Sequence, residues 1–289
     1  MSGRNRNNRR KPQHSHPKSS RDSDGICYPA DNPVIKIFKS LSYQLNERHD
    51  RHERLVKLSR DTTIESKRII FLLHSSDLYI SRKEDHGKIL MEARDRLTKL
   101  IQGPIKNMGL ELNNRSDYLH YKATSPGFQE FVEAYTFYSL LNEKKIATHK
   151  TIQAELNYNI KIKGVEMQLT TTLTQRDYML GLADLTGEVM RRNIHCITSG
   201  DVGECDFILE VIQTLCRGFV SLMWTPRELY RKLSTTRLNT RKVENALFAI
   251  ELRGTEAVRT PHFLQMPLIQ DDLNYITDDY NDEQFDDYY

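Results

Sequence analysis

The stretch FQEFVEAYTFYSLL, residues Phe128–Leu141, decides the fold, because it is apolar on nearly every side of a helix and still carries two carboxylates. Glu130 and Glu133 are three positions apart, which places them about 60° apart on one face of an α-helix. A helix that is apolar nearly all round is buried on several faces. Carboxylates in such a helix need a partner to stay ionised, so we expect a cation beside them.

A second acid pair lies in the segment Tyr178–Ile197, where Asp184 and Glu188 are four positions apart. Arg191 and His195 continue this stripe, and apolar side chains form the opposite one. From the pattern alone, a surface pair neutralised by Arg191 and Arg192 is as good an interpretation as a buried site. If the two acid-bearing helices pack at the usual separation of about 8–10 Å, however, all four acids can converge.

Two glycines in the second segment, Gly181 and Gly187, each weaken a helix by about 1 kcal/mol relative to alanine. We expect them to allow another backbone or a ligand to approach beside the acids.

Four carboxylates without histidine or cysteine in the first pair are a donor set for Mg²⁺ or Mn²⁺. Neither pair has the Glu-x-x-His spacing of di-iron bundles, which disfavours iron. A hard-metal cluster of this type suits cleavage of phosphodiesters or pyrophosphates. The candidate metal-binding and catalytic residues are therefore Glu130, Glu133, Asp184 and Glu188.

The rest of the chain is typical of an all-α bundle of about six or seven helices, spanning residues 32–256. Glycine and proline at Gly103–Pro104 predict the end of one helix. Lys150–Thr174 is rich in threonine and asparagine, which indicates a loop with a short strand-like run. No strand–helix alternation of a parallel sheet is present.

The two ends of the chain carry opposite charges. Residues 1–21 hold seven Lys and Arg and no acid, whereas residues 260–289 hold eight Asp and Glu and no Lys or Arg. Residues 1–31 and 257–289 are therefore expected to be disordered tails. The basic tail fits a nuclear-import signal or an RNA-contacting arm, and equally a solvated tail without a role.

The composition of the chain is typical of a protein of the cytoplasm and nucleus. No apolar run approaches the roughly 20 residues of a membrane span, and the first residues are polar and basic, so neither a secretory signal nor membrane contact is expected. The four cysteines have neither CxxC nor zinc-ligand spacing and are expected to be reduced thiols.

A basic ridge follows residues 48–60, with Lys or Arg at every third position and acids between them. Salt bridges are the favoured individual role of these side chains, and contact with RNA phosphates is the alternative, with Arg51 and Arg54 as candidates. Arg191, one turn beyond Glu188, is the best candidate for a substrate phosphate. His195 is expected to be structural.

Four segments closely resemble the translin-associated factor X branch of the translin family. They are ERHDRHERLVKLSRDTTIESKRIIFLLH (Glu47–His74), FQEFVEAYTF (Phe128–Phe137), YMLGLADLTGEVMR (Tyr178–Arg191) and KVENALFAIELRG (Lys242–Gly254). The resemblance implies a translin-like fold and a closed, octamer-like barrel formed with translin. It also implies a Mg²⁺-dependent endoribonuclease that degrades the nicked passenger strand during RISC activation and processes tRNA fragments. The RISC-loading machinery is an implied partner.

The same resemblance implies that the X subunit carries the catalytic acids, at Glu130, Glu133, Asp184 and Glu188. The residue pattern alone is also compatible with two other functions. One is a non-catalytic scaffold that binds and stabilises translin, and the other is an all-α nucleotide pyrophosphohydrolase.

Overall fold

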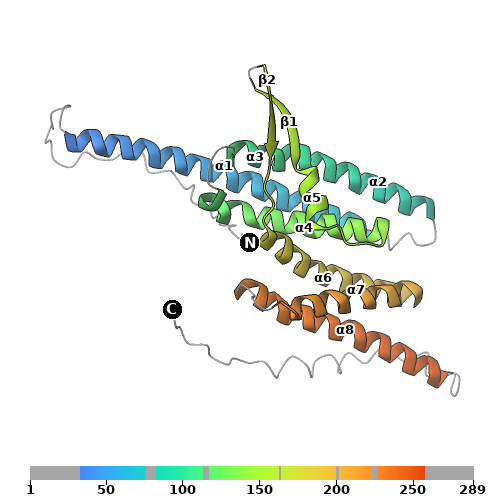
Figure 1. Ribbon diagram of the computed structural model, residues 1–289. Helices are drawn as coiled ribbons and strands as arrows, with labels where there is room; N and C mark the ends of the chain where they lie inside the picture. Colours follow the sequence, from blue (N-terminus) through green and yellow to red (C-terminus); the bar gives the residue numbers. More distant parts are fainter. Residues whose placement is uncertain are drawn as a thin grey trace, which may run out of the picture. The chain divides into compact units, whose positions relative to one another are not determined.

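A computed structural model describes residues 33–75, 83–112, 117–162, 164–199, 202–222 and 227–257 (Figure 1). The chain divides into two units, Met1–His49 and Asp50–Tyr289. The first contributes only the beginning of one helix to the described residues, and the site described below lies wholly within the second. Both expected tails lie outside the described residues, apart from position 257, so their predicted disorder and the domain limits stay predictions.

The all-α prediction is confirmed. Six helices are long: α1 (Pro33–Ser75), α2 (Lys83–Leu100), α4 (Tyr121–Glu143), α6 (Gln175–Ser199), α7 (Val202–Val220) and α8 (Arg227–Ala257). The shorter elements are η2 (Ile101–Ile105), α3 (Lys106–Leu112), η3 (Asp117–His120), α5 (His149–Glu155), β1 (Asn157–Ile162) and β2 (Val165–Thr170). Among the described residues no helix is both long and apolar enough to cross a membrane.

Gly103–Pro104 does not end a helix, contrary to the prediction. The chain passes from α2 through a short π-helix, η2, directly into α3. A π-turn lets the helix absorb a proline, whose ring removes one backbone donor. Ile101 and Ile105, on either side of the pair, are 3% and 0% exposed, so packing into the core favours continuation.

The segment Lys150–Thr174 is more ordered than a loop. It contains α5 and an antiparallel hairpin of β1 and β2, in which Tyr158 pairs with Leu169. Both of these side chains are buried, and the Tyr158 hydroxyl donates a hydrogen bond to the Ile101 carbonyl oxygen at 3.0 Å. Two buried residues and one hydrogen bond therefore fix the base of the hairpin to η2.

Helix α4 is continuous through Pro126, and the next residue makes a close helix contact. The Gly127 amide donates to the Ser59 hydroxyl of α1 at 3.0 Å, and a Cβ at Gly127 would lie 2.9 Å from the Ser59 carbonyl oxygen. No side chain fits there without separating α1 from α4. Glycine at this position therefore allows α1 and α4 to pack closely.

Helix α6 lies between α4 and α8, packed along both (Figure 1). A Cβ at Gly181 would lie 2.5 Å from the Gln129 carbonyl oxygen of α4. The expectation that Gly181 allows another backbone to approach is therefore confirmed. This close crossing brings the two acid-bearing helices together.

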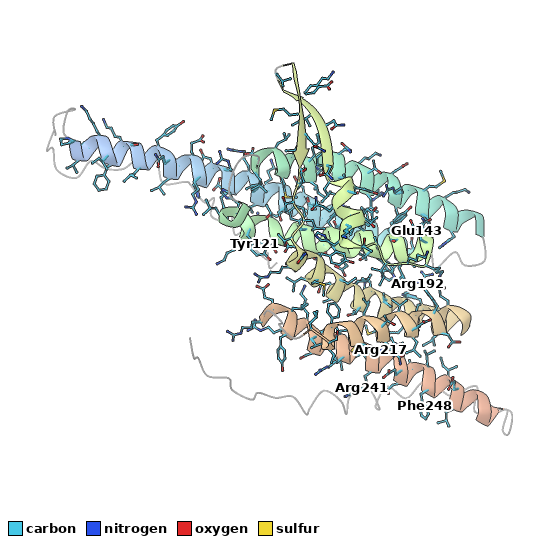
Figure 2. All side chains as sticks on the ribbon, in the orientation of Figure 1. Tyr121, Glu143, Arg192, Arg217, Arg241 and Phe248 are labelled. Atoms are coloured by element: carbon cyan, nitrogen blue, oxygen red, sulfur yellow. The ribbon has the colours of Figure 1, made fainter. Side chains whose placement is uncertain are left out.

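On α8, the aromatic side chain of Phe248 is 65% exposed (Figure 2).

Candidate active site

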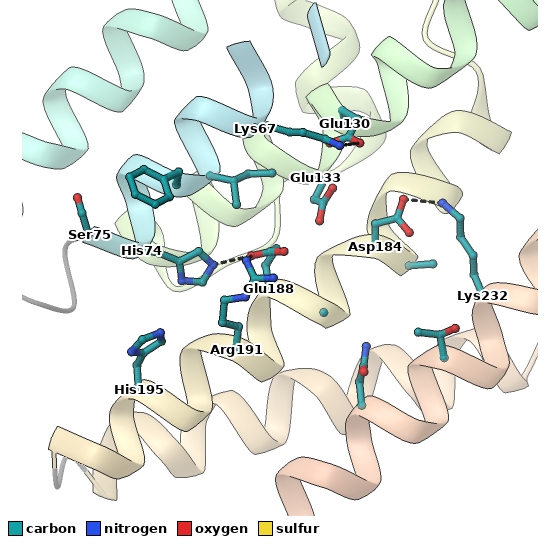
Figure 3. A pocket seen from close by; sticks show the side chains of 16 residues that line it. Lys67, His74, Ser75, Glu130, Glu133, Asp184, Glu188, Arg191, His195 and Lys232 are labelled. Atoms are coloured by element: carbon teal, nitrogen blue, oxygen red, sulfur yellow. Dashed lines mark hydrogen bonds and ion pairs between the residues drawn. The ribbon is translucent and has the colours of Figure 1, made fainter. Parts of the chain in front are cut away.

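One open cavity of about 810 Å³ is lined by all four predicted acids (Figure 3). Glu130 and Glu133 project into it from α4, and Asp184 and Glu188 project from α6. Helices α1 and α8 supply the remaining walls. The spacing of the acids along two helices thus becomes a single cluster because α4 and α6 cross closely at Gly181.

Glu133 is the innermost of the four acids, with 8% of the residue exposed. Burial, followed by the charges of Asp184, Glu130 and Glu188, raises the pKa of its carboxyl from 4.5 to about 8, although Lys232 opposes the shift. The other three acids therefore act directly on Glu133. At neutral pH this group carries a proton in most molecules.

Three permanent cations are paired with the other three acids. Lys67 Nζ of α1 lies 3.2 Å from a Glu130 oxygen, and Lys232 Nζ of α8 lies 2.5 Å from Asp184 Oδ2. Arg191 Nη1 lies 2.9 Å from Glu188 Oε2, one turn along α6. Within the described residues Glu133 is the acid of this cluster that has no ion pair.

A histidine from α1 also contacts the cluster. His74 Nε2 lies 2.6 Å from Glu188 Oε2, and the His74 ring packs on Phe137 with centroids 4.8 Å apart. The His195 ring lies 6.2 Å from the His74 ring, at the same end of the cavity (Figure 3). Glu188 is therefore held between a histidine of α1 and an arginine of its own helix.

Sequence reasoning missed His74 and Lys232 as parts of the site. A signal for His74 existed, because Lys67 and His74 are seven positions apart and so share one face of α1. No such signal existed for Lys232, since nothing in the sequence specifies which turn of α8 passes the acids.

The other predicted residues divide between the cavity and the surface. Arg191 and His195 line the cavity (Figure 3), whereas Arg192 pairs with Glu204 of α7 and is not among the lining residues. Arg51 and Arg54 both contact Glu111 of α3, and Arg54 Nε lies 2.8 Å from Glu111 Oε1. Neither lines the cavity. Their role in RNA binding stays a prediction, and their salt-bridge partner Glu111 belongs to another helix rather than to the acids interleaved with the ridge.

Gly187 lines the cavity and differs from Gly181 in its surroundings. A Cβ built at Gly187 would meet only the Asn239 side-chain nitrogen of α8, at the ordinary contact distance of 3.8 Å. Helix packing therefore does not require glycine at this position. Because Gly187 has no side chain, the space beside Glu188 is open.

The donor chemistry of the cavity fits a hard divalent cation. Four carboxylates line the cavity beside three positive charges, and burial together with the charges of the other three acids raises the pKa of Glu133. Among the described residues, no three His, Cys, Asp or Glu side chains are gathered closely enough to hold an ion as they stand. Glu130 is instead paired with a lysine of α1 and Asp184 with a lysine of α8. Glu188 contacts His74 of α1.

Residues 50–254 match the model of the translin family. The chain belongs to this family. It is 35% identical over 261 residues to "Translin-associated protein X" of Mus musculus, with 86% of this chain and 88% of the relative covered. It is 29% identical over 226 residues to "Translin-associated protein X homolog" of Schizosaccharomyces pombe, with 76% and 89% covered.

Two solved structures show the same fold. The crystal structure of apo-NeC3PO superimposes with a TM-score of 0.55 at 18% identity, covering 73% of this chain and 95% of that one. The AfC3PO–duplex RNA complex superimposes with a TM-score of 0.50 at 20% identity, covering 74% and 96%. The translin-like fold expected from the sequence is therefore confirmed.

Proposed function

We propose that this protein is the catalytic subunit of a Mg²⁺-dependent endoribonuclease that assembles with translin. The observation that carries the proposal is the joining of four carboxylates and three permanent cations in one cavity. The likeness to relatives named translin-associated protein X supports translin as the partner. The RNA duplex bound by AfC3PO, a protein of the same fold, supports RNA as the ligand.

The proposed substrate is single-stranded RNA, including the nicked passenger strand during RISC activation and tRNA fragments, in the cytoplasm and nucleus. Glu130, Glu133, Asp184 and Glu188 would hold Mg²⁺ or Mn²⁺. When bound, the metal supplies an activated water and a positive charge beside the leaving oxygen. Arg191, which lines the cavity beside Glu188, would hold a phosphate oxygen of the substrate.

The protein's own groups set the protonation state of the cavity. Glu133 holds a proton on its carboxyl near neutral pH and must release it before all four carboxylates can act on one cation. His74 holds Glu188 from the α1 side and fixes the direction of its carboxylate.

Exposed apolar side chains on α8 support assembly with a partner. Tyr230 and Phe248 are 63% and 65% exposed, and large aromatic side chains of this kind are enriched in protein interfaces. We propose an octamer-like barrel with translin, in which the cavity acids face the enclosed RNA.

Cleavage of a labelled single-stranded RNA by the complex with translin tests the proposal. Glu133→Ala and Asp184→Ala are expected to abolish Mg²⁺-dependent cleavage while leaving assembly, followed by size-exclusion chromatography, unchanged. Glu166→Ala is the matched control, because this acid pairs with Lys161 on the hairpin, outside the cavity. Unchanged cleavage by the two cavity variants would contradict the assignment.

The same assay separates the two other functions. A scaffold would support translin assembly without any Mg²⁺-dependent cleavage that requires the four acids. A pyrophosphohydrolase would release pyrophosphate from nucleoside triphosphates and leave the RNA intact.

A further inference from the structure

We infer that Lys67 and Lys232 are the phosphate-binding half of this site. They hold the acids in the metal-free protein and bind a substrate phosphodiester once a metal ion takes those acids. The inference rests on the proposed function, since it assumes that the acids hold a metal. It adds two residues from α1 and α8 to the substrate contacts, beyond Arg191.

The Lys232 ammonium group is fully engaged by acceptors at the edge of the acid cluster. It contacts Asp184 Oδ2 at 2.5 Å, Gln129 Oε1 at 3.2 Å and the Leu180 carbonyl oxygen at 3.3 Å. These acceptors come from α4 and α6, so one side chain of α8 joins three helices. A lysine has three N–H donors, and all three are used.

Gln129 fixes the position of this lysine through a buried network. Its Nε2 donates to the Ser125 hydroxyl at 2.8 Å, which orients its carbonyl oxygen toward Lys232. Ser125 in turn donates to Asp177 Oδ1 at 2.5 Å, and Asp177 is 1% exposed. A group held this way stays beside Asp184 when Asp184 changes partner.

Lys67 acts on the opposite side of the cavity and is held more loosely. Its Nζ lies 3.2 Å from Glu130, and its side chain is 63% exposed. Such a lysine can turn from a carboxylate to a phosphate at little cost, because an exposed pair contributes little stability. The two lysines thus approach the acid cluster from α1 and from α8 (Figure 3).

The count of charges links the binding of metal to the binding of phosphate. If a divalent cation takes Glu130 and Asp184, both lysines lose their counter-charges inside a half-enclosed cavity. A phosphodiester carries the negative charge that replaces them, and lysine ammonium groups are ordinary phosphate ligands. Metal and RNA must then strengthen one another's binding by the same factor.

Two opposing effects of a single substitution test the inference. In the complex with translin, Mn²⁺ binding is measured by the electron paramagnetic resonance signal of the free ion. The measurement is made with and without a cleavage-resistant 2′-O-methyl RNA strand. For the wild type, the RNA is expected to tighten Mn²⁺ binding by about tenfold, a coupling of ordinary size.

Lys232→Met is expected to tighten Mn²⁺ binding without RNA by roughly tenfold or more, because a positive charge beside the ion is removed. The same variant is expected to lose most of the strengthening by RNA. Lys232→Arg keeps the positive charge, so its Mn²⁺ binding without RNA should be as weak as that of the wild type. Lys161→Met is the matched control, because Lys161 also pairs with an acid but lies on β1, and it should behave like the wild type.

A purely structural lysine would weaken Mn²⁺ binding both with and without RNA when replaced, and that result overturns the inference. Unchanged binding in both conditions overturns it as well. If Lys232→Met fails to assemble, Lys67→Met decides, since its exposed side chain is not needed for folding. Absence of any Mn²⁺ binding by the wild type contradicts the proposed function itself, so the two failures are distinct.

Discussion

Replacing Glu133 by glutamine should make the protein more stable at neutral pH, by an amount that grows with pH. The Glu133 carboxyl has a pKa of about 8 in the folded protein, against 4.5 as its ordinary value. Between these two values the folded chain holds a proton that the unfolded chain has released. The free energy of unfolding therefore falls by about 1.4 kcal/mol per pH unit as pH rises.

The free energy of unfolding falls with rising pH because the pKa of Glu133 is raised in the folded protein. Protonated Glu133 contributes its full stability below about pH 4.5, and that stability is lost as pH rises toward 8. Glutamine has the same shape and never ionises, so the variant lacks this slope. Between pH 5 and pH 7.5 the variant should gain about 3 kcal/mol relative to the wild type.

Urea unfolding of the full chain, followed by circular dichroism at pH 5, 6, 7 and 7.5 in the presence of EDTA, measures this difference. Other titrating groups are common to both proteins and cancel. Glu166→Gln serves as the control, because this exposed acid pairs with Lys161 on the hairpin, outside the cavity. A constant difference between Glu133→Gln and the wild type would refute the argument, because it would mean that burial and the neighbouring acids do not raise the pKa of Glu133.

Three further substitutions test the packing around the site, each by the free energy of unfolding. Gly181→Ala should destabilise by roughly 1–3 kcal/mol, because its Cβ would lie 2.5 Å from a backbone oxygen of α4; a neutral result would deny the close crossing of the two helices. Gly187→Ala should instead stabilise by up to about 1 kcal/mol through helix propensity, since its nearest neighbour would be 3.8 Å away, and a marked loss would show hidden crowding. Asp177→Ala should destabilise by roughly 2–4 kcal/mol, because the hydroxyl groups of Tyr121, Ser125 and Thr174 would lose their buried acceptor; a change below about 0.5 kcal/mol would contradict the network.

The acids of the site could be predicted from sequence because the signal was local. Glu130 and Glu133 interrupt a helix that is apolar on nearly all sides, and Gly181 marks a close approach on the helix that carries the second pair. Spacing along a helix fixes the face on which a side chain lies. Two such faces indicated that the four acids could converge, but only on the condition that the two helices pack side by side.

The cations that hold the acids could not be predicted in the same way. Lys232 reaches Asp184 only because α8 packs along α6, and that alignment depends on contacts far apart in the sequence. Arg192 was a partner of the acids only in the alternative interpretation as a surface pair, and it pairs with Glu204 instead, since one step along a helix turns a side chain by about 100°. Counter-charges on neighbouring helices are a property of the packed structure.

The errors in the fold have a similar cause. Gly103–Pro104 has the local chemistry of a helix end, yet buried Ile101 and Ile105 carry the helix through a π-turn. The hairpin of β1 and β2 has few buried residues, so its hydrophobic pattern is weak, and its pairing at Tyr158 depends on a contact with η2. In both cases tertiary packing outweighs local preference.

The location of a bound ion tests the central claim most directly. Crystals of the complex with translin, grown with Mn²⁺, would show the ion by its anomalous scattering. We predict a peak between α4 and α6, at roughly 2.0–2.5 Å from carboxylate oxygens of both Glu130 or Glu133 and Asp184 or Glu188. Saturating Mn²⁺ with no peak that bridges the two helices, and with Lys232 still on Asp184, would contradict the account.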